Sequence, residues 1–221
     1  MYYIGIDLGG TNVAAGVTDK EGHLLGKASI PCPRGSEAIA DAMAESARLA
    51  VKEAGVPLEE CASVGVASPG NIDPEAGIVF HAFNLELHNV PLAQMVSDRL
   101  GGIPTLLEND ANAAALGEFV AGAGKGKNSL VAITLGTGVG SGAVLEGKLY
   151  TGFNYAAFES GHTVIHRGGA PLHLRPEGLL GGLRLGHRAD PLHPGGHGGP
   201  SRECSVEVGS HPGGGQRQDP L

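Results

Sequence analysis

The sequence predicts an α/β fold built as two lobes, and three observations support that prediction. Apolar residues alternate with polar or small residues in three successive segments near the N-terminus, which is the pattern of antiparallel strands. Helical and strand patterns then alternate along the chain. A second sequence of strand, glycine turn and strand follows, so the plan of the first lobe begins to repeat.

Apolar spacing and breaker residues set the expected elements. A long helix is expected over 36–54, with Ser36 as its N-cap and Gly55 ending it. Shorter helices are expected over 92–100 and 110–123, and a turn at 69–71. The expected strands are 3–7, 13–18, 24–31, 63–67, 105–108, 129–135 and 139–145.

The composition divides the chain near residue 168. The last 54 residues hold 14 of the 38 glycines and 7 of the 14 prolines, and they lack Lys, Phe, Tyr and Trp. Such a segment buries too little apolar surface to offset its ordering entropy, so disorder is expected. The predicted organisation is an N-terminal lobe over 1–122, the start of a C-terminal lobe over 123–167 and an aberrant tail over 168–221.

Bulk properties exclude several classes of protein. A net charge of −8 argues against nonspecific nucleic-acid binding. No apolar run is long enough to span a membrane, and no signal peptide is recognised. The three cysteines, Cys32, Cys61 and Cys204, form no metal or disulfide pattern, which suits a reducing cytoplasm.

Residues 5–12, Gly-Ile-Asp-Leu-Gly-Gly-Thr-Asn, join two strands through a glycine turn. Bare backbone N–H groups in such a turn can approach phosphate, Thr11 adds a hydroxyl donor, and Asp7 can hold hydrated Mg²⁺. An ordinary hairpin turn is the alternative. A similar turn at 136–142 strengthens the phosphate interpretation. That second turn also fits a dinucleotide fingerprint, but a strand rather than a helix is expected after it.

Asp110 lies next to Asn109, at the junction between an expected strand and an expected helix. The residue can be a helix N-cap, but a carboxylate at the end of a parallel strand also faces the crevice where α/β sheets bind ligands. There it can accept a proton from a substrate hydroxyl. Asn84, and the pair Glu159 and His162, are further polar candidates whose alternative roles are structural.

Together these motifs resemble the ROK family of bacterial sugar kinases and sugar-responsive repressors, its glucokinase-like members in particular. Residues 7–12 resemble the first phosphate motif, 108–112 the catalytic motif and 135–140 the second phosphate motif. Segments 68–70 and 84–85 match sugar-site segments. The resemblance implies an actin-like, ribonuclease H-like ATPase fold, here with the first lobe complete and the second truncated.

The resemblance also implies an activity, the ATP-dependent phosphorylation of a hexose at its 6-hydroxyl. Glucose is the favoured substrate, ATP and Mg²⁺ are required, Asp110 is the general base and Asp7 lies near Mg²⁺ through water. The expected phosphate-binding residues are Gly9, Gly10, Thr11, Asn12, Gly136, Thr137 and Gly138, with Asp7. The expected sugar-binding residues are Gly70, Asn84, Asn109, Asp110, Glu159 and His162.

The sequence departs from the family pattern around Glu159 and His162. The family usually has Gly-Glu-apolar-Gly-His, whereas Phe158 replaces the first glycine here and Ser160 the apolar residue. In the family His162 would also be one ligand of a structural Zn²⁺, with three cysteines some ten residues later. Residues 172–182 contain no cysteine. We therefore expect this chain not to bind structural Zn²⁺ and to have little kinase activity.

A frameshift between about residues 168 and 172 explains the missing cysteines. Back-translated with GC-rich codons and read one base later, residues 172–182 encode Cys-Thr-Cys-Gly-Arg-Lys-Gly-Cys-Trp-Glu, which is the zinc motif. The same shift explains the excess of Gly, Pro, Arg and His in the tail. Sequencing the gene across codons 165–185 tests this hypothesis.

Several alternatives remain open from the sequence. The chain could be a sugar-responsive ROK regulator, although it starts at the first phosphate strand and keeps Asp110. N-acetylglucosamine, N-acetylmannosamine and fructose kinases share these motifs, and polyphosphate could replace ATP as donor. The expected protein is cytoplasmic, binds a hexose and neither nucleic acid nor membrane, and belongs to a family that is often homo-oligomeric.

Overall fold

The computed structural model describes residues 1–136 and 138–164, together with the backbone of 205–209, and it falls into two units. The first unit comprises Met1–Ala113 and Gly152–Ala156, and the second comprises Ala114–Thr151 and Ala157–Leu221. This division comes before the lobe boundary expected at residues 122 and 123. Among the described residues, no helix has the length and apolar character needed to cross a membrane.

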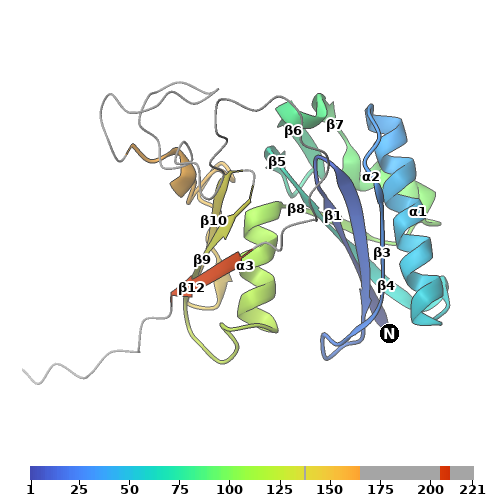
Figure 1. Cartoon of the computed structure of the whole chain (residues 1–221), viewed down its shortest axis with the longest axis horizontal. Helices are drawn as coiled ribbons and strands as arrows, with labels where there is room; N and C mark the ends of the chain where they lie inside the picture. The colour runs from blue at the N-terminus through green and yellow to red at the C-terminus, as the bar shows by residue number, and fades with distance from the viewer. Residues whose placement is uncertain (137, 165–204, 210–221) are drawn as a thin grey trace, which may run out of the picture. The chain divides into compact units, whose positions relative to one another are not determined.

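A five-stranded mixed sheet forms the centre of the first unit, in the order β3-β2-β1-β4-β8 (Figure 1). Strands β1, β2 and β3 pair antiparallel, whereas β4 and β8 run parallel to β1. The strands are β1 (Tyr2–Leu8), β2 (Asn12–Thr18), β3 (Leu24–Pro31), β4 (Cys61–Ser68) and β8 (Thr105–Asn109). The α/β class predicted from the sequence is confirmed.

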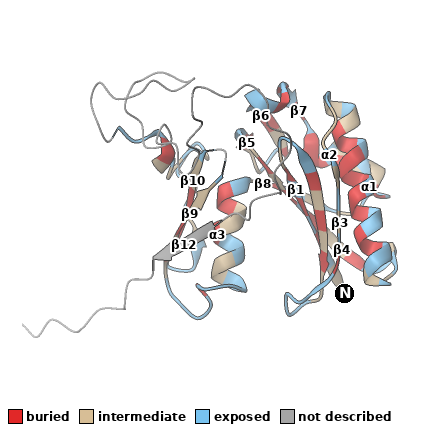
Figure 2. Ribbon diagram, in the orientation of Figure 1, coloured by how far each residue is buried: buried red, intermediate tan, exposed pale blue. Residues whose placement is uncertain are grey.

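Two helices, α1 (Ser36–Ala54) and α2 (Leu92–Arg99), pack with the sheet to form the core. Alternate residues of β1 are buried, namely Ile4, Ile6 and Leu8, so Asp7 belongs to the opposite, open face. Figure 2 shows the buried residues of α1 along one side of that helix. At Gly26 of β3 an added Cβ would lie 2.4 Å from the Ala54 nitrogen, so a glycine is required there.

The start of α1 differs from the prediction. Gly35, with φ 89°, is the N-cap and makes no side-chain cap bond, while Ser36 is already the first helical residue. The Gly35 carbonyl accepts the first helical hydrogen bond, from the Ile39 N–H. The end is as predicted, because Gly55 adopts the left-handed conformation with φ 67° and its N–H reaches the last-turn carbonyls.

A small three-stranded antiparallel sheet, in the order β5-β6-β7, was not predicted. Its strands are β5 (Asn71–Asp73), β6 (Ile78–Ala82) and β7 (Leu87–Val90), separated from the central sheet by the expected turn at Gly70. The short 3₁₀ segment η2 (Phe83–Leu85) joins β6 to β7, and η1 (Leu58–Glu60) precedes β4. Because each strand has only three to five residues, their hydrophobic alternation is too short to identify from the sequence.

The second unit has its own four-stranded antiparallel sheet, in the order β11-β10-β9-β12. Its strands are β9 (Leu130–Leu135), β10 (Val139–Leu145), β11 (Lys148–Leu149) and β12 (Ser205–Gly209), with the 3₁₀ segment η3 (Ser160–His162). A small core contains Ala115, Leu130, Ala132 and Val144. Ala115 belongs to α3 (Asp110–Val120), which starts in the first unit and ends three residues earlier than expected.

Strand β12 lies within the predicted tail. Residues 205–209 lie within the segment expected to be disordered, yet they pair antiparallel with β9 from Leu135 to Val131. Backbone N–H and C=O groups on the open edge of β9 offer hydrogen bonds to any extended segment, whatever its composition. The rest of the predicted tail lies outside the described residues.

Candidate functional site

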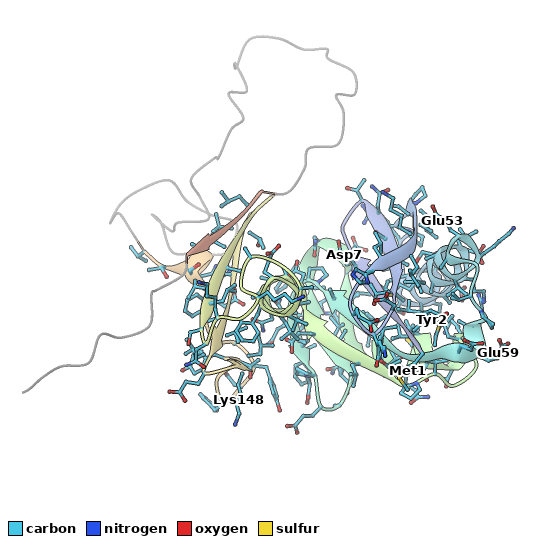
Figure 3. The ribbon with its side chains drawn as sticks, turned by 90° about the horizontal axis from the view of Figure 1, so that it is seen from below. Met1, Tyr2, Asp7, Glu53, Glu59 and Lys148 are labelled. Carbon is cyan, nitrogen blue, oxygen red and sulfur yellow. The ribbon has the colours of Figure 1, made fainter. Side chains whose placement is uncertain are left out.

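Three neighbouring strands of the central sheet bring polar residues to one edge. In the register of β1, β4 and β8, Asp7 lies opposite Ala67, and Ala67 lies opposite Glu108. Figure 3 labels Tyr2 and Asp7, which lie near the two ends of β1. Since adjacent strands are about 4.8 Å apart, the backbones at Asp7 and Glu108 are about 10 Å apart. Asp7 and the start of α3 therefore flank one edge of the sheet.

Asn109, rather than Asp110, caps helix α3. Its Oδ1 accepts hydrogen bonds from the backbone N–H groups of Ala111 at 3.0 Å and Asn112 at 3.2 Å, which is the N-cap pattern. Asp110 is the first helical residue, and its Oδ1 accepts a hydrogen bond from the Ala111 N–H at 2.9 Å. The capping role considered for Asp110 thus belongs to its neighbour.

The carboxyl groups of Asp7 and Asp110 both have raised pKa values. Partial burial of the carboxyl is the largest cause for Asp7, and the negative charge of Asp110 raises its pKa further. Burial also raises the pKa of Asp110, against the lowering effect of its backbone hydrogen bonds. Both residues still reach solvent. Two accessible carboxyl groups that repel one another and have raised pKa values are typical of a site that binds a cation or accepts a proton.

Glu108 is a site residue that sequence reasoning did not single out. Its Oε1 accepts hydrogen bonds from the Asn109 backbone N–H at 2.9 Å and from Nδ2 of Asn112 at 3.2 Å. Asn112 is only 4% exposed, so its amide needs this partner. Glu108 therefore fixes the first turn of α3, on which Asp110 is held. The sequence signal that could have identified Glu108 is its spacing from Asn112, an acid and an amide four residues apart across the junction of a strand and a helix.

The first glycine turn forms the predicted hairpin between β1 and β2. The Gly9 N–H donates to the Asn12 carbonyl at 3.0 Å, and an added Cβ at Gly9 would lie 2.9 Å from that same oxygen. Thr11 uses its carbonyl to accept from the Cys32 N–H at 2.8 Å. Nδ2 of Asn84 lies 3.5 Å from the position of a Cβ at Gly10. Asn84, which is predicted to bind the sugar, therefore lies beside the turn that is predicted to bind phosphate.

Gly70 connects the small sheet to the end of β8. With φ +93°, it packs so tightly that an added Cβ would lie 2.1 Å from the carbonyl oxygen of His81. The Gly70 carbonyl accepts a hydrogen bond of 3.4 Å from Nδ2 of Asn109. Four predicted residues, Gly70, Asn84, Asn109 and Asp110, thus belong to linked parts of the first unit.

The second glycine turn lies in the second unit, between β9 and β10. The Gly136 N–H donates to the Gly138 carbonyl at 2.9 Å. Among the residues that the structure describes, none has an atom within 4 Å of an added Cβ at either glycine. Thr137 lies outside the described residues. Because β10 follows directly, the dinucleotide fingerprint is excluded by its context.

Glu159 and His162 lie side by side after the second turn, with Oε2 and Nε2 3.9 Å apart. Their segment is held by Ser141 of β10, whose hydroxyl accepts from the Ser160 N–H at 3.1 Å and donates to the Phe158 carbonyl. Phe158 adopts φ +64°, a conformation that favours glycine. Ser141 was missed by sequence reasoning, although a serine between two glycines in an apolar strand is an unusual pattern.

The residues present do not fit a four-ligand zinc site at His162. A structural zinc site needs four nitrogen or sulfur ligands, and the chain has no cysteine between residues 62 and 203. Segment 172–182 lies outside the described residues. Asp7, in contrast, fits a hydrated Mg²⁺, because it offers an accessible carboxylate with few competing hydrogen bonds.

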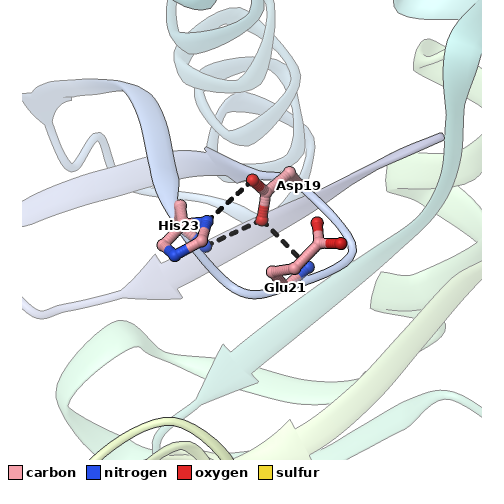
Figure 4. Close-up of side chains that lie close together, drawn as sticks. All are labelled: Asp19, Glu21 and His23. Carbon is pink, nitrogen blue, oxygen red and sulfur yellow. Dashed lines mark hydrogen bonds and ion pairs between the residues drawn. The ribbon is translucent and has the colours of Figure 1, made fainter.

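A second group of potential metal ligands lies on the turn between β2 and β3 (Figure 4). The Asp19 carboxylate accepts hydrogen bonds from the backbone N–H groups of Glu21 and His23, both at 2.9 Å, and contacts Nδ1 of His23 at 2.9 Å. The backbone bond from His23 is the largest cause lowering the pKa of Asp19. These bonds account for the cluster as a turn-stabilising motif.

Comparisons with known proteins identify relatives over most of the chain. A model of the ROK family matches residues 3–182. Glucokinases of Streptomyces coelicolor and Thermotoga maritima are each 41% identical to this chain, over 179 and 180 residues, covering 81% and 80% of it and 52% and 55% of their own lengths. The chain thus spans about half the length of these curated relatives.

A solved structure is also similar to this chain. The ROK family glucokinase of Streptomyces griseus, in complex with glucose and AMPPNP, is 36% identical with a TM-score of 0.73, over 81% of this chain and 55% of that one. This similarity confirms the actin-like fold expected for the chain. From its motifs, its fold and the family match, the chain belongs to the ROK family.

Proposed function

We propose that this chain carries the hexose- and phosphate-binding residues of an ATP-dependent sugar kinase, with Asp110 as the general base. The observation that carries the proposal is the raised pKa of Asp110 at the end of β8, where Asn109 has taken over the capping of α3. A carboxylate whose pKa is raised towards the working pH accepts a proton more readily than an ordinary surface aspartate. Relatives named glucokinase favour glucose as substrate.

The proposed reaction moves one phosphoryl group. The sugar 6-oxygen attacks the γ-phosphorus of ATP, the bond from that phosphorus to the bridging oxygen of ADP breaks, and Asp110 accepts the hydroxyl proton. Gly70, Asn84 and Asn109 are proposed to orient the sugar, together with Glu159 and His162. Such reactions depend mainly on positioning and charge stabilisation rather than on covalent steps.

The two glycine turns are proposed to bind the phosphates through their backbone N–H groups. Gly9, Gly10, Thr11 and Asn12 supply the first turn, and Gly136, Thr137 and Gly138 supply the second. Asp7 would hold Mg²⁺ through water, and the ion would supply charge neutralisation for the transferring phosphoryl group. The repulsion between Asp7 and Asp110 supports this assignment, because a cation near the pair would relieve it.

Two measurements test the proposal. Calorimetric titration of the chain with glucose should detect binding, which Asn84→Ala should weaken by tenfold or more. Turnover is measured with ATP, Mg²⁺ and glucose in a version restored to the neighbouring reading frame after codon 168. There Asp110→Asn should lower kcat by about 10²–10⁴, the usual contribution of a general base. An unchanged kcat in that variant would refute the role of Asp110.

A further inference from the structure

Two histidines of the small sheet form a close cross-strand pair. His81 of β6 lies opposite His88 of β7 in the antiparallel register, and their Nδ1 atoms are 2.8 Å apart. The rings meet nearly at right angles, with centroids 4.9 Å apart. Phe83 stacks on His81, with centroids 5.7 Å apart and an interplanar angle of 9°. Both histidines are exposed, and His81 contacts His88 and Phe83.

The distance between the two nitrogens suits one coordination geometry better than another. Metal–nitrogen bonds to imidazole are about 2.0–2.1 Å. Two nitrogens at adjacent corners of a tetragonal or octahedral ion are therefore about 2.9 Å apart, whereas two corners of a tetrahedron are about 3.3 Å apart. The observed 2.8 Å is close to the first value.

We propose that His81 and His88 form a binding site for a transition-metal cation of tetragonal or octahedral geometry, such as Cu²⁺ or Ni²⁺. Both rings would bind through Nδ1 and keep their proton on Nε2, so the ion replaces the hydrogen bond between them. Asn71 of β5 lies opposite His81 in the register and shares its face of the sheet, where it can supply an oxygen ligand. Water fills the remaining positions.

This site is independent of the proposed kinase function and of the group on the β2–β3 turn. None of Asp7, Asn84 and Asp110 contributes a ligand to it. At the β2–β3 turn, the carboxylate of Asp19 accepts hydrogen bonds from backbone N–H groups. The Nδ1 atoms of His81 and His88 contact one another, and these are the two atoms that would bind the ion. The proposal therefore survives if the kinase assignment fails, and the converse also holds.

Thermal unfolding with added NiCl₂ tests whether the site exists in the folded chain. A cation that binds the folded chain alone raises the midpoint, while histidines that bind equally in both states leave it unchanged. We expect Ni²⁺ to raise Tm, and His81→Gln or His88→Gln to abolish the rise. His23→Gln is the matched control and should retain it. A rise that persists in both site variants would overturn the proposal.

Electron paramagnetic resonance with one equivalent of Cu²⁺ identifies the ligands directly. The spectrum of the unmodified chain should show coupling to two imidazole nitrogens, and His88→Gln should remove one of them. The Cu²⁺ dissociation constant should rise at least tenfold in the same variant. A spectrum and an affinity that are the same in His88→Gln as in the unmodified chain would show that the ion binds elsewhere.

Discussion

Gly70→Ala tests the contact that joins the small sheet to the candidate site. Gly70 has φ +93°, and a Cβ at this position would lie 2.1 Å from the His81 carbonyl oxygen and 2.9 Å from the Ala82 Cα. Both neighbours are backbone atoms of β6, so no side chain can rotate away. The strand and the turn must separate by about 1 Å to restore an ordinary van der Waals contact.

The expected cost has two parts. The left-handed backbone costs alanine about 1–2 kcal/mol, and forcing a methyl group into a closely packed contact costs about 1–3 kcal/mol. We therefore expect the free energy of unfolding to fall by about 2–5 kcal/mol. Gly102→Ala is the matched control, because Gly102 has φ +84° with no atom within 4 Å of its Cβ position, so that it meets the first cost alone.

Urea unfolding of both variants separates the two costs. Gly70→Ala should be less stable than Gly102→Ala by about 1–3 kcal/mol. Displacing the Gly70 carbonyl also removes the acceptor of Asn109 Nδ2, so glucose affinity should fall about fivefold, the equivalent of one hydrogen bond. If the two variants unfolded within about 0.5 kcal/mol of each other, the proposed steric contact would be wrong.

Three further predictions follow from the site and its supports. Because burial raises the pKa of Asp110 above 3.8, the folded chain holds the carboxyl proton more tightly than the unfolded chain, and the stability of the fold falls as the pH rises through the raised pKa. Asp110→Asn should therefore stabilise the chain at pH 7 but not at pH 3. Equal gains in stability at the two pH values would contradict this reasoning. Phe158→Gly should leave the chain about 1–2 kcal/mol more stable than Phe153→Gly, since only Phe158 has positive φ and Phe153 is 96% exposed; equal melting temperatures would exclude the strain. Glu108→Ala should destabilise by about 1–3 kcal/mol by leaving the buried Asn112 amide unpaired, whereas Glu108→Gln should recover most of the loss in chemical denaturation.

The elements predicted best have strong local patterns. Helix α1 was predicted with the end that it has, because its residues carry a repeating apolar face and stop at a glycine, and only its N-cap, expected at Ser36, lies one residue earlier. The two glycine hairpins and the junction of β8 with α3 were also predicted, since apolar strands bounded by glycines need little tertiary information. The phosphate and catalytic roles of the residues they carry remain predictions.

The errors lie where local patterns are short or ambiguous. Strands β5, β6 and β7 are stabilised by pairing with one another, so the segment between residues 71 and 90 gave only the end of a turn and one polar candidate, Asn84. Either Asn109 or Asp110 could cap α3 on the evidence of residue type alone. Phe158 could not be expected to have positive φ, because its conformation depends on the bonds of Ser141 with the segment that follows.

The sequence by itself determined the family, the α/β class and the order of the motifs, because these depend on residue types and on hydrophobic periods of a few residues. Tertiary structure decided the register that aligns Asp7 with Glu108 across β4, the contact of Gly70 with His81, and the pairing of His81 with His88. Each of these depends on strands that are separated along the chain, and local sequence patterns do not specify which residues of such strands lie opposite one another.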